Sequence, residues 1–311
     1  MKKFVLSVVA TLAVVASPAL AADMPAKAPK APVAAPSPFE LAIGAALVSD
    51  YNFRGISQSD RKPSLWGYIE PRYNISKDVQ IYAGLGVETI KFPNNANLEV
   101  DLYAGIRPTI GPVAFDFGVW YYYYPGGTTF TGVFPSCANT STPLLFCNSI
   151  KNNVSFVEFF GKATWTVNDS LALGANAFYA PNWLNTGAPG TYGALTAKVT
   201  APSSMLAKDW GAYVSGEVGH YWFGTTDAFY GTIKLPEYNT WNFGIGVTYQ
   251  VFTVDLRYYD TNLSRGNCNV LTSDHGATFS AAAVSAINNG GESKWCSSTV
   301  ILKLAIDTTI K

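Results

Sequence analysis

One feature constrains this chain more than any other: apolar and polar residues alternate with a period of two along many short segments. The first such segment is Glu40–Gly55, in which Leu41 and Leu47 share one parity while Asp50 and Arg54 share the other. Because successive side chains of a β-strand point to opposite faces, this segment has one apolar face and one charged face. The fold then depends on which face meets water and which meets lipid.

Eleven further segments with this alternation follow, and turn-forming residues separate them. The expected strands are Glu40–Gly55, Ser64–Asn74, Val79–Ile90, Leu98–Arg107, Val113–Tyr124, Asn153–Val167, Ser170–Ala180, Thr191–Thr200, Asp209–Phe223, Tyr238–Tyr249, Phe252–Tyr259 and Cys296–Ile310. The connections after the second, fourth, sixth and tenth strands have two to five residues, whereas those after the fifth, seventh, ninth and eleventh are long and polar. Bacterial barrels place short turns in the periplasm and long loops outside. We therefore predict an all-β fold, a transmembrane antiparallel up-and-down β-barrel of about 12 strands, over residues 39–311.

The composition agrees with a chain that exposes apolar surface to lipid. Only 14% of the 311 residues are charged, compared with about 25% in soluble proteins. Past the N-terminus the sequence has no run of ~20 apolar residues, the length that a transmembrane helix needs. The 21 basic and 21 acidic residues cancel, so the net charge gives no electrostatic footprint for nucleic acid.

The N-terminus has the three parts of a secretory signal peptide. Lys2 and Lys3 form a basic region, Phe4–Ala16 is apolar, and an A-x-A cleavage site ends at Ala21. We predict a cleaved signal peptide over residues 1–21; an uncleaved anchor is the alternative. A Pro/Ala-rich periplasmic tether is expected over 22–38. The expected location is the outer membrane of a Gram-negative bacterium, with membrane lipid and the barrel-assembly machinery as partners.

The four cysteines predict two disulfide bonds, because an exported chain meets an oxidising compartment. Cys137–Cys147 and Cys268–Cys296 are the favoured pairs, since each lies within one polar, strand-poor segment. Four cysteines allow three connectivities. Zinc binding is the other reading of cysteine, but the chain has no C-x-x-C and only two histidines. We therefore expect no metal and no other cofactor.

Charged residues within the strands share one parity. An Arg or Lys at mid-depth on the lipid face would cost about 2–4 kcal/mol, so the charged parity is assigned to the lumen. The residues predicted to line the pore are Asp50, Arg54, Glu70, Arg72, Glu88, Glu99, Asp101, Arg107, Asp116, Glu158, Lys162, Glu217, Asp255, Arg257, Lys303 and Asp307. Aromatic residues near strand ends, at the alternating positions assigned to the lipid face, are expected to form girdles at the membrane interfaces. They are Tyr51, Phe53, Tyr121, Tyr123, Trp165, Tyr179, Trp222, Trp241, Tyr249 and Tyr258.

Three short motifs resemble those of a known family. Residues 49–60, SDYNFRGISQSD, are similar to the opening motif of the TorF or Gcw_chp family of proteins assigned as outer-membrane porins. Residues 255–261, DLRYYDT, resemble its motif near the C-terminus, and residues 105–108, GIRP, resemble it as well. The resemblance implies a porin and carries over no catalytic residues. The chain departs from outer-membrane proteins in general because it ends in Lys311 rather than in an aromatic residue.

The expected function follows from the size and charge of the lumen. A twelve-stranded barrel lies between filled eight-stranded barrels and open porins of sixteen or more strands. Mixed charge with a small acidic excess predicts passive diffusion of small hydrophilic solutes or ions with a weak cation preference, and no enzymatic activity. The end of the first strand, Asp50–Arg54, is expected at the outer mouth of this pore.

Three alternatives remain open. Paired charges can plug the lumen, and the long loops can serve a structural or adhesive surface protein. A barrel hydrolase would use His220 or His275, but no serine can be placed beside His220, and no nucleotide or metal motif is present.

Overall fold

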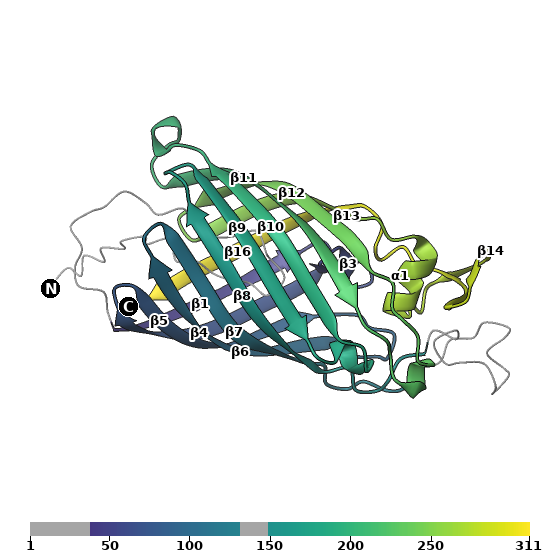
Figure 1. Ribbon diagram of the computed structural model, residues 1–311. Coiled ribbons are helices and arrows are strands. Elements are labelled where there is room, and N and C mark those ends of the chain that lie inside the picture. The colour runs from purple at the N-terminus through teal and green to yellow at the C-terminus, as the bar shows by residue number, and fades with distance from the viewer. Residues whose placement is uncertain (1–37, 131–148) are drawn as a thin grey trace, which may run out of the picture.

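Twelve strands form a closed antiparallel barrel in the computed structural model, which describes residues 38–130 and 149–311 (Figure 1). They are β1 (Phe39–Val48), β4 (Ser64–Ser76), β5 (Val79–Thr89), β6 (Leu98–Ile110), β7 (Val113–Tyr123), β8 (Phe156–Thr166), β9 (Leu171–Ala180), β10 (Gly190–Thr200), β11 (Trp210–Phe223), β12 (Tyr238–Tyr249), β13 (Phe252–Thr261) and β16 (Thr299–Ile310). Leu41 on β1 is opposite Ile310 on β16, and this pairing closes the ring. The predicted up-and-down barrel of about twelve strands is confirmed.

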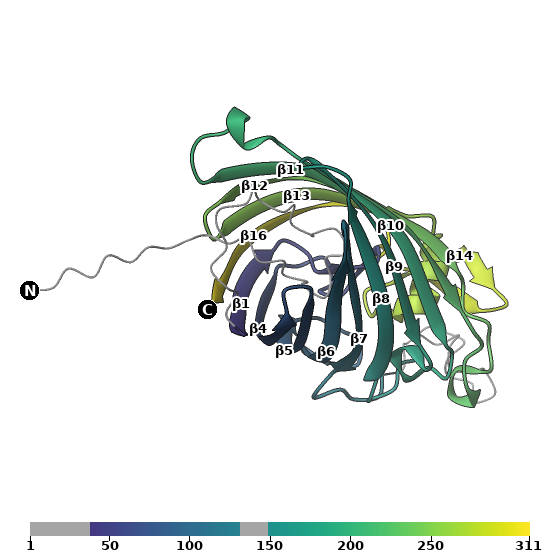
Figure 2. The ribbon, with the colours of Figure 1, turned by 60° about the vertical axis from the view of Figure 1, so that its left-hand side comes forward.

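The two ends of the barrel carry different connections. Tight turns at residues 77–78, 111–112 and 250–251 lie at the end where β1 begins and β16 finishes (Figures 1 and 2). The longest connection at this end, residues 201–209, holds the short helix η4 (Ser203–Met205). The opposite end carries the long connections, including the short helices η3 (Trp183–Asn185) and η5 (Ala228–Tyr230).

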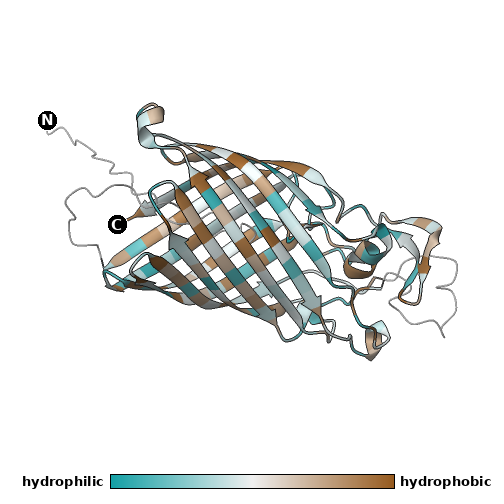
Figure 3. Cartoon of the chain, turned by 45° about the horizontal axis from the view of Figure 1, so that its top comes forward, coloured by the Kyte–Doolittle hydropathy of each residue, from teal (hydrophilic) through white to brown (hydrophobic). Residues whose placement is uncertain are grey.

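The outer face of the barrel is apolar. Figure 3 shows hydrophobic bands along the strands, and Leu195, Val214 and Ile245 are 63%, 54% and 58% exposed. A contiguous apolar surface of this extent marks a membrane or protein contact, and alternation with a polar interior is the pattern of a membrane barrel. Trp165 and Trp222 are also exposed, as expected for girdle residues. None of the helices in the described ranges is long and apolar enough to cross a membrane.

The first strand is shorter than its pattern predicts. β1 stops at Val48, and residues 49–63 leave the wall and enter the lumen before β4 begins at Ser64. Within them β2 (Asn52–Phe53) pairs with β3 (Ile56–Ser57) in a tight hairpin. Because Val48 and Ser64 face each other in the β1–β4 ladder, the wall is complete without residues 49–63, here called the inserted segment.

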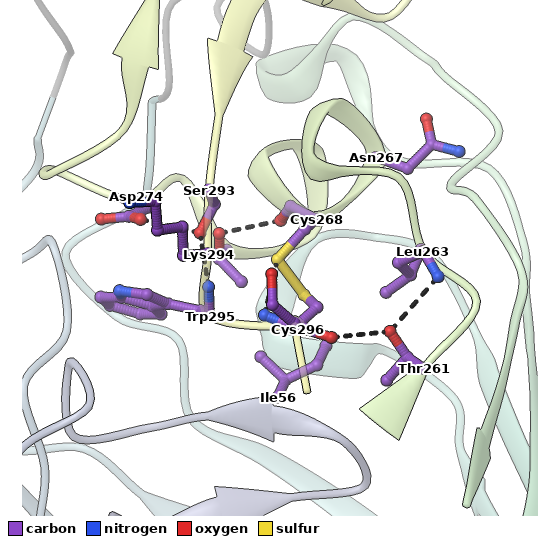
Figure 4. The surroundings of a disulfide bond; sticks show 12 residues. Ile56, Thr261, Leu263, Asn267, Cys268, Asp274, Ser293, Lys294, Trp295 and Cys296 are labelled. Carbon is purple, nitrogen blue, oxygen red and sulfur yellow. Dashed lines mark hydrogen bonds between the residues drawn. A yellow bond between two sulfur atoms is a disulfide. The ribbon is translucent and has the colours of Figure 1, made fainter. Parts of the chain in front are cut away.

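The connection from β13 to β16 is more structured than expected. It contains helix α1 (Arg265–Thr272) and a hairpin of β14 (Thr278–Ser285) and β15 (Asn288–Glu292), so its reading as strand-poor is wrong. The predicted Cys268–Cys296 disulfide is present and ties α1 to the chain just before β16 (Figure 4). The predicted Cys137–Cys147 pair, the signal peptide and the tether up to residue 37 lie outside the described residues.

Candidate functional site

The residues predicted to line a pore fill the barrel interior. None of the sixteen is exposed, and twelve of them have less than a tenth of their surface accessible. Charged side chains along an open water path would be accessible, so the lumen is occluded at their level. The other four residues, which keep slightly more accessible surface when the backbone is included, are Arg54, Arg107, Lys162 and Asp307. Whether these sixteen residues line a conducting pore stays a prediction.

Arg54 is carried by the inserted segment to a wall distant from β1 in the ring. Its Nη1 and Nη2 donate to the two carboxylate oxygens of Glu158 on β8 at 2.7 and 2.8 Å, and Nη1 also donates to the Tyr221 hydroxyl at 2.9 Å. The guanidinium lies 4.4 and 4.6 Å from the ring centres of Phe178 and Tyr192. A bidentate, charge-assisted pair flanked by aromatic rings is among the strongest polar contacts in proteins. Arg54 therefore fixes the inserted segment across the lumen.

Tyr51 and Phe53 also lie inside the lumen, so their prediction as girdle residues is wrong. The Tyr51 side chain is fully buried, and its hydroxyl donates to Glu99 Oε1 at 2.6 Å. The Phe53 ring meets Tyr122 edge to face with centres 5.9 Å apart. The Asp50–Arg54 stretch does lie near the outer mouth, because its partners Glu99, Glu158 and Tyr221 stand within three residues of the outer ends of β6, β8 and β11. It lies inside the lumen there rather than at the end of a wall strand, because the chain turns inward directly after β1.

Asp50 shapes this inward turn. Its Oδ1 accepts hydrogen bonds from the hydroxyls of Ser57 at 2.6 Å and Ser59 at 3.0 Å, and Arg61 lies 3.6 Å from its Oδ2. Burial raises the pKa of the Asp50 carboxyl above its ordinary value, and the two hydroxyls and the guanidinium only partly offset this. The inserted segment thus carries its own polar core and is a compact unit within the barrel.

Other lumen charges are paired along the wall. Glu70 accepts from Arg72 Nε at 2.5 Å and from Arg107 Nη1 at 2.8 Å. Arg257 lies 3.0 Å from Asp255. Buried charges are costly unless they are paired and hydrogen-bonded, and these pairs meet that condition. Glu88, Glu99 and Asp101 differ, because their carboxylates lie together rather than beside a basic side chain.

An apolar space lies between the inserted segment and the long connections. Aromatic and aliphatic side chains from several connections line it, among them Phe53, Phe92, Trp183, Tyr230 and Leu271. No sequence pattern indicates this space, because its walls come from connections that only the closed barrel brings together.

The two histidines do not form a catalytic pair with serine in the described ranges. His220 Nδ1 lies 2.7 Å from Asn239 Oδ1, and His275 Nε2 lies 3.8 Å from Asp60 Oδ2. Neither ring is hydrogen-bonded to a serine hydroxyl among these residues.

A closed antiparallel ring with an apolar outer face and a charged interior defines the class of outer-membrane β-barrel proteins. The chain belongs to the Gcw_chp family, described as "bacterial protein of unknown function", whose model matches residues 33–287. The family resemblance drawn from the sequence motifs is confirmed. No curated protein matches the chain.

Several solved barrels are similar in outline. The NanC porin has a TM-score of 0.41 at 9% identity, over 87% of this chain and 100% of that one. LpxR from Salmonella typhimurium has a TM-score of 0.40 at 7% identity, over 86% and 99%. The translocator domain of the autotransporter NalP from Neisseria meningitidis has a TM-score of 0.38 at 11% identity, over 89% of each chain. Similarity at this level says nothing about function.

Proposed function

We propose that this protein is a gated outer-membrane channel for small hydrophilic solutes or ions, and that the described conformation is its closed state. One observation carries the proposal: the inserted segment crosses a charged lumen that the barrel wall encloses without it. A segment that is no part of the wall can move without opening the ladder between strands.

The lining supports passage of polar solutes. Without the inserted segment the lumen would present carboxylate, guanidinium, ammonium and hydroxyl groups together with aromatic rings such as those of Trp120 and Phe178. Of the fourteen predicted lining residues on the wall, nine are acidic and five are basic. An excess of carboxylates favours cations over anions in a narrow pore, which supports a weak cation preference.

A non-conducting barrel is the second candidate. The observation that favours it is the buried Arg54–Glu158 pair, which holds the inserted segment in place from across the lumen. A barrel closed in this way permanently would act through its outer connections, as a structural or adhesive surface protein.

Planar-bilayer recordings distinguish the two candidates. We expect rare, short openings from the wild type and more frequent openings from the double variant Arg54→Gln/Glu158→Gln, which removes the pair without leaving a charge unpaired. Arg257→Gln/Asp255→Asn is the matched control, because it removes a buried pair that does not involve the inserted segment. The gate is refuted when both double variants open no more often than the wild type in bilayers that contain folded protein.

A further inference from the structure

Three buried carboxylates share one wall of the lumen. Glu88 on β5 lies directly opposite Glu99 on β6, and Asp101 follows two residues later on the same face of β6. One oxygen of each lies within 4.8 Å of the other two. The residues are 2%, 1% and 0% exposed, so water does not separate them. Like charges directly opposite each other in a sheet repel, so the three carboxylates are all ionised together only when a cation compensates them.

No basic side chain supplies this charge. Across residues 38–130 and 149–311, none of the three carboxylates forms an ion pair with Arg, Lys or His. Other buried acids of the lumen do have such partners: Glu70, Asp116, Glu158 and Asp255 each lie beside an arginine. Glu217 is also buried without an ion pair, but it stands alone and accepts a hydrogen bond from the Tyr192 hydroxyl at 2.6 Å. The cluster differs because three such carboxylates lie together.

Several oxygens of the cluster are unused. Glu88 Oε2 and both carboxylate oxygens of Asp101 are buried and make no hydrogen bond. The indole N–H of Trp120 faces Asp101 as a weak donor, outside good hydrogen-bond geometry. Glu99 is oriented by the Tyr51 hydroxyl, which donates to its Oε1 at 2.6 Å. Buried oxygens without donors call for an explanation, and a bound ion is one that accounts for all three. A carboxylate oriented by a hydrogen bond, as Glu99 is, is also typical of metal ligands.

We propose that Glu88, Glu99 and Asp101 bind a divalent cation, with calcium preferred over magnesium. Hard cations take carboxylate oxygens, and calcium binds them at about 2.3–2.6 Å in a flexible geometry, whereas magnesium needs a tight octahedron at about 2.0–2.1 Å. Oxygens that all lie within 4.8 Å of one another can reach one ion, and a set supplied by two neighbouring strands suits the flexible geometry of calcium better than a strict octahedron. The expectation of no metal rested on cysteine and histidine patterns, which do not report an all-oxygen site. The proposal does not depend on channel function.

Isothermal titration of the full, refolded protein with calcium chloride at pH 7.5, after chelation, tests the site. We expect saturable binding by the wild type and at least tenfold weaker binding by Glu88→Gln/Glu99→Gln/Asp101→Asn. Glu217→Gln is the matched control, because Glu217 is a buried lumen acid outside the cluster and its loss should leave binding unchanged. When the triple variant does not fold, Glu88→Gln alone takes its place, with the same expected loss.

Thermal unfolding gives a second readout. Chelation should lower the unfolding temperature of the wild type but not that of the neutralised variant, in which no repulsion remains to be compensated. Absence of binding by folded wild type at millimolar calcium would overturn the proposal. Binding that the triple variant retains would place calcium elsewhere and overturn it as well. Magnesium binding as tight as that of calcium would overturn the stated preference.

Discussion

Arg54 is the residue on which the closed lumen depends. It comes from a segment next to β1, yet its partner Glu158 lies 104 positions later in the chain. Its side chain is 6% exposed and that of Glu158 is fully buried. Neither charge is solvated, so each depends on the other for its stability.

Replacing one partner alone should therefore lower the free energy of unfolding more than replacing both. Arg54→Gln leaves the Glu158 carboxylate buried and unpaired, and breaking a buried pair in this way costs about 3–5 kcal/mol. Arg54→Gln/Glu158→Gln should recover part of this loss. Denaturant unfolding of the barrel in lipid vesicles gives the free energy of unfolding of both variants. Losses of free energy that are strictly additive in a double-mutant cycle would contradict the coupling between Arg54 and Glu158.

Several strand glycines make room for lumen tyrosines. A Cβ at Gly246 would lie 2.1 Å from the ring of Tyr213, whose hydroxyl donates to Asp255. Gly246→Ala should lower the free energy of unfolding by about 1–3 kcal/mol through overpacking. The control is Gly67→Ala, where the nearest atom would be 3.7 Å away. Equal stability of the two variants in the same unfolding assay would argue against this packing.

The inserted segment is the element that the sequence pattern missed. Alternation continues through Tyr51 and Phe53 after β1 has ended, so periodicity alone extends the strand. One signal was available in the sequence, Gly55, whose φ of +87° lies in the region that favours glycine. The connection of fifteen residues, where Val48 and Ser64 need only a tight turn, became visible with the structure. The destination of the segment could not be predicted, because its partners become neighbours only when the barrel closes.

Helix α1 was missed as well, although a local signal exists. Ser264 caps its N-terminus by accepting a hydrogen bond from the Asn267 backbone N–H at 3.1 Å. The helix is only eight residues long, too short for an apolar period to stand out in a polar segment. The disulfide could be predicted without any knowledge of the helix. Export to an oxidising compartment favours disulfides, and the two cysteines lie within one segment of the chain.

The disulfide should stabilise the outer connection between β13 and β16 rather than the strands of the barrel. It joins cysteines 28 residues apart, and closing a loop of this length contributes about 3–4 kcal/mol in the chain-entropy model. In Cys268→Ser/Cys296→Ser we expect trypsin to cleave rapidly at Arg265 or Lys294 while the strands stay intact. Limited proteolysis followed by mass spectrometry checks this. Cleavage within the strands, or no change in rate, would contradict it.

The same disulfide lies beside the inserted segment. Ile56 sits next to it in Figure 4, and the Ser57 backbone N–H donates to the Trp295 carbonyl at 2.9 Å. Arg61 donates to the carbonyl of Lys294 at 2.6 Å. The outer connection and the inserted segment are therefore neighbours that support each other.

At the scale of the whole molecule, the sequence was sufficient to predict the barrel wall but not the contacts inside the lumen. Strand positions, closure of β1 on β16 and the lipid-facing parity follow from alternation and the cost of charge in lipid. Which charges pair is decided by the cross-section of the closed barrel. The bidentate contact of Arg54 and the gathering of Glu88, Glu99 and Asp101 therefore required the structure.

The central claim is that residues 49–63 form the gate of a channel. The most direct test replaces them with a two-residue turn, which the pairing of Val48 with Ser64 permits, and records single channels in planar bilayers. Heat-modifiable mobility and circular dichroism establish that the shortened barrel is folded. We predict long-lived conductance steps with weak cation selectivity, in contrast to rare openings of the wild type. A folded, shortened barrel that stays silent would contradict the claim.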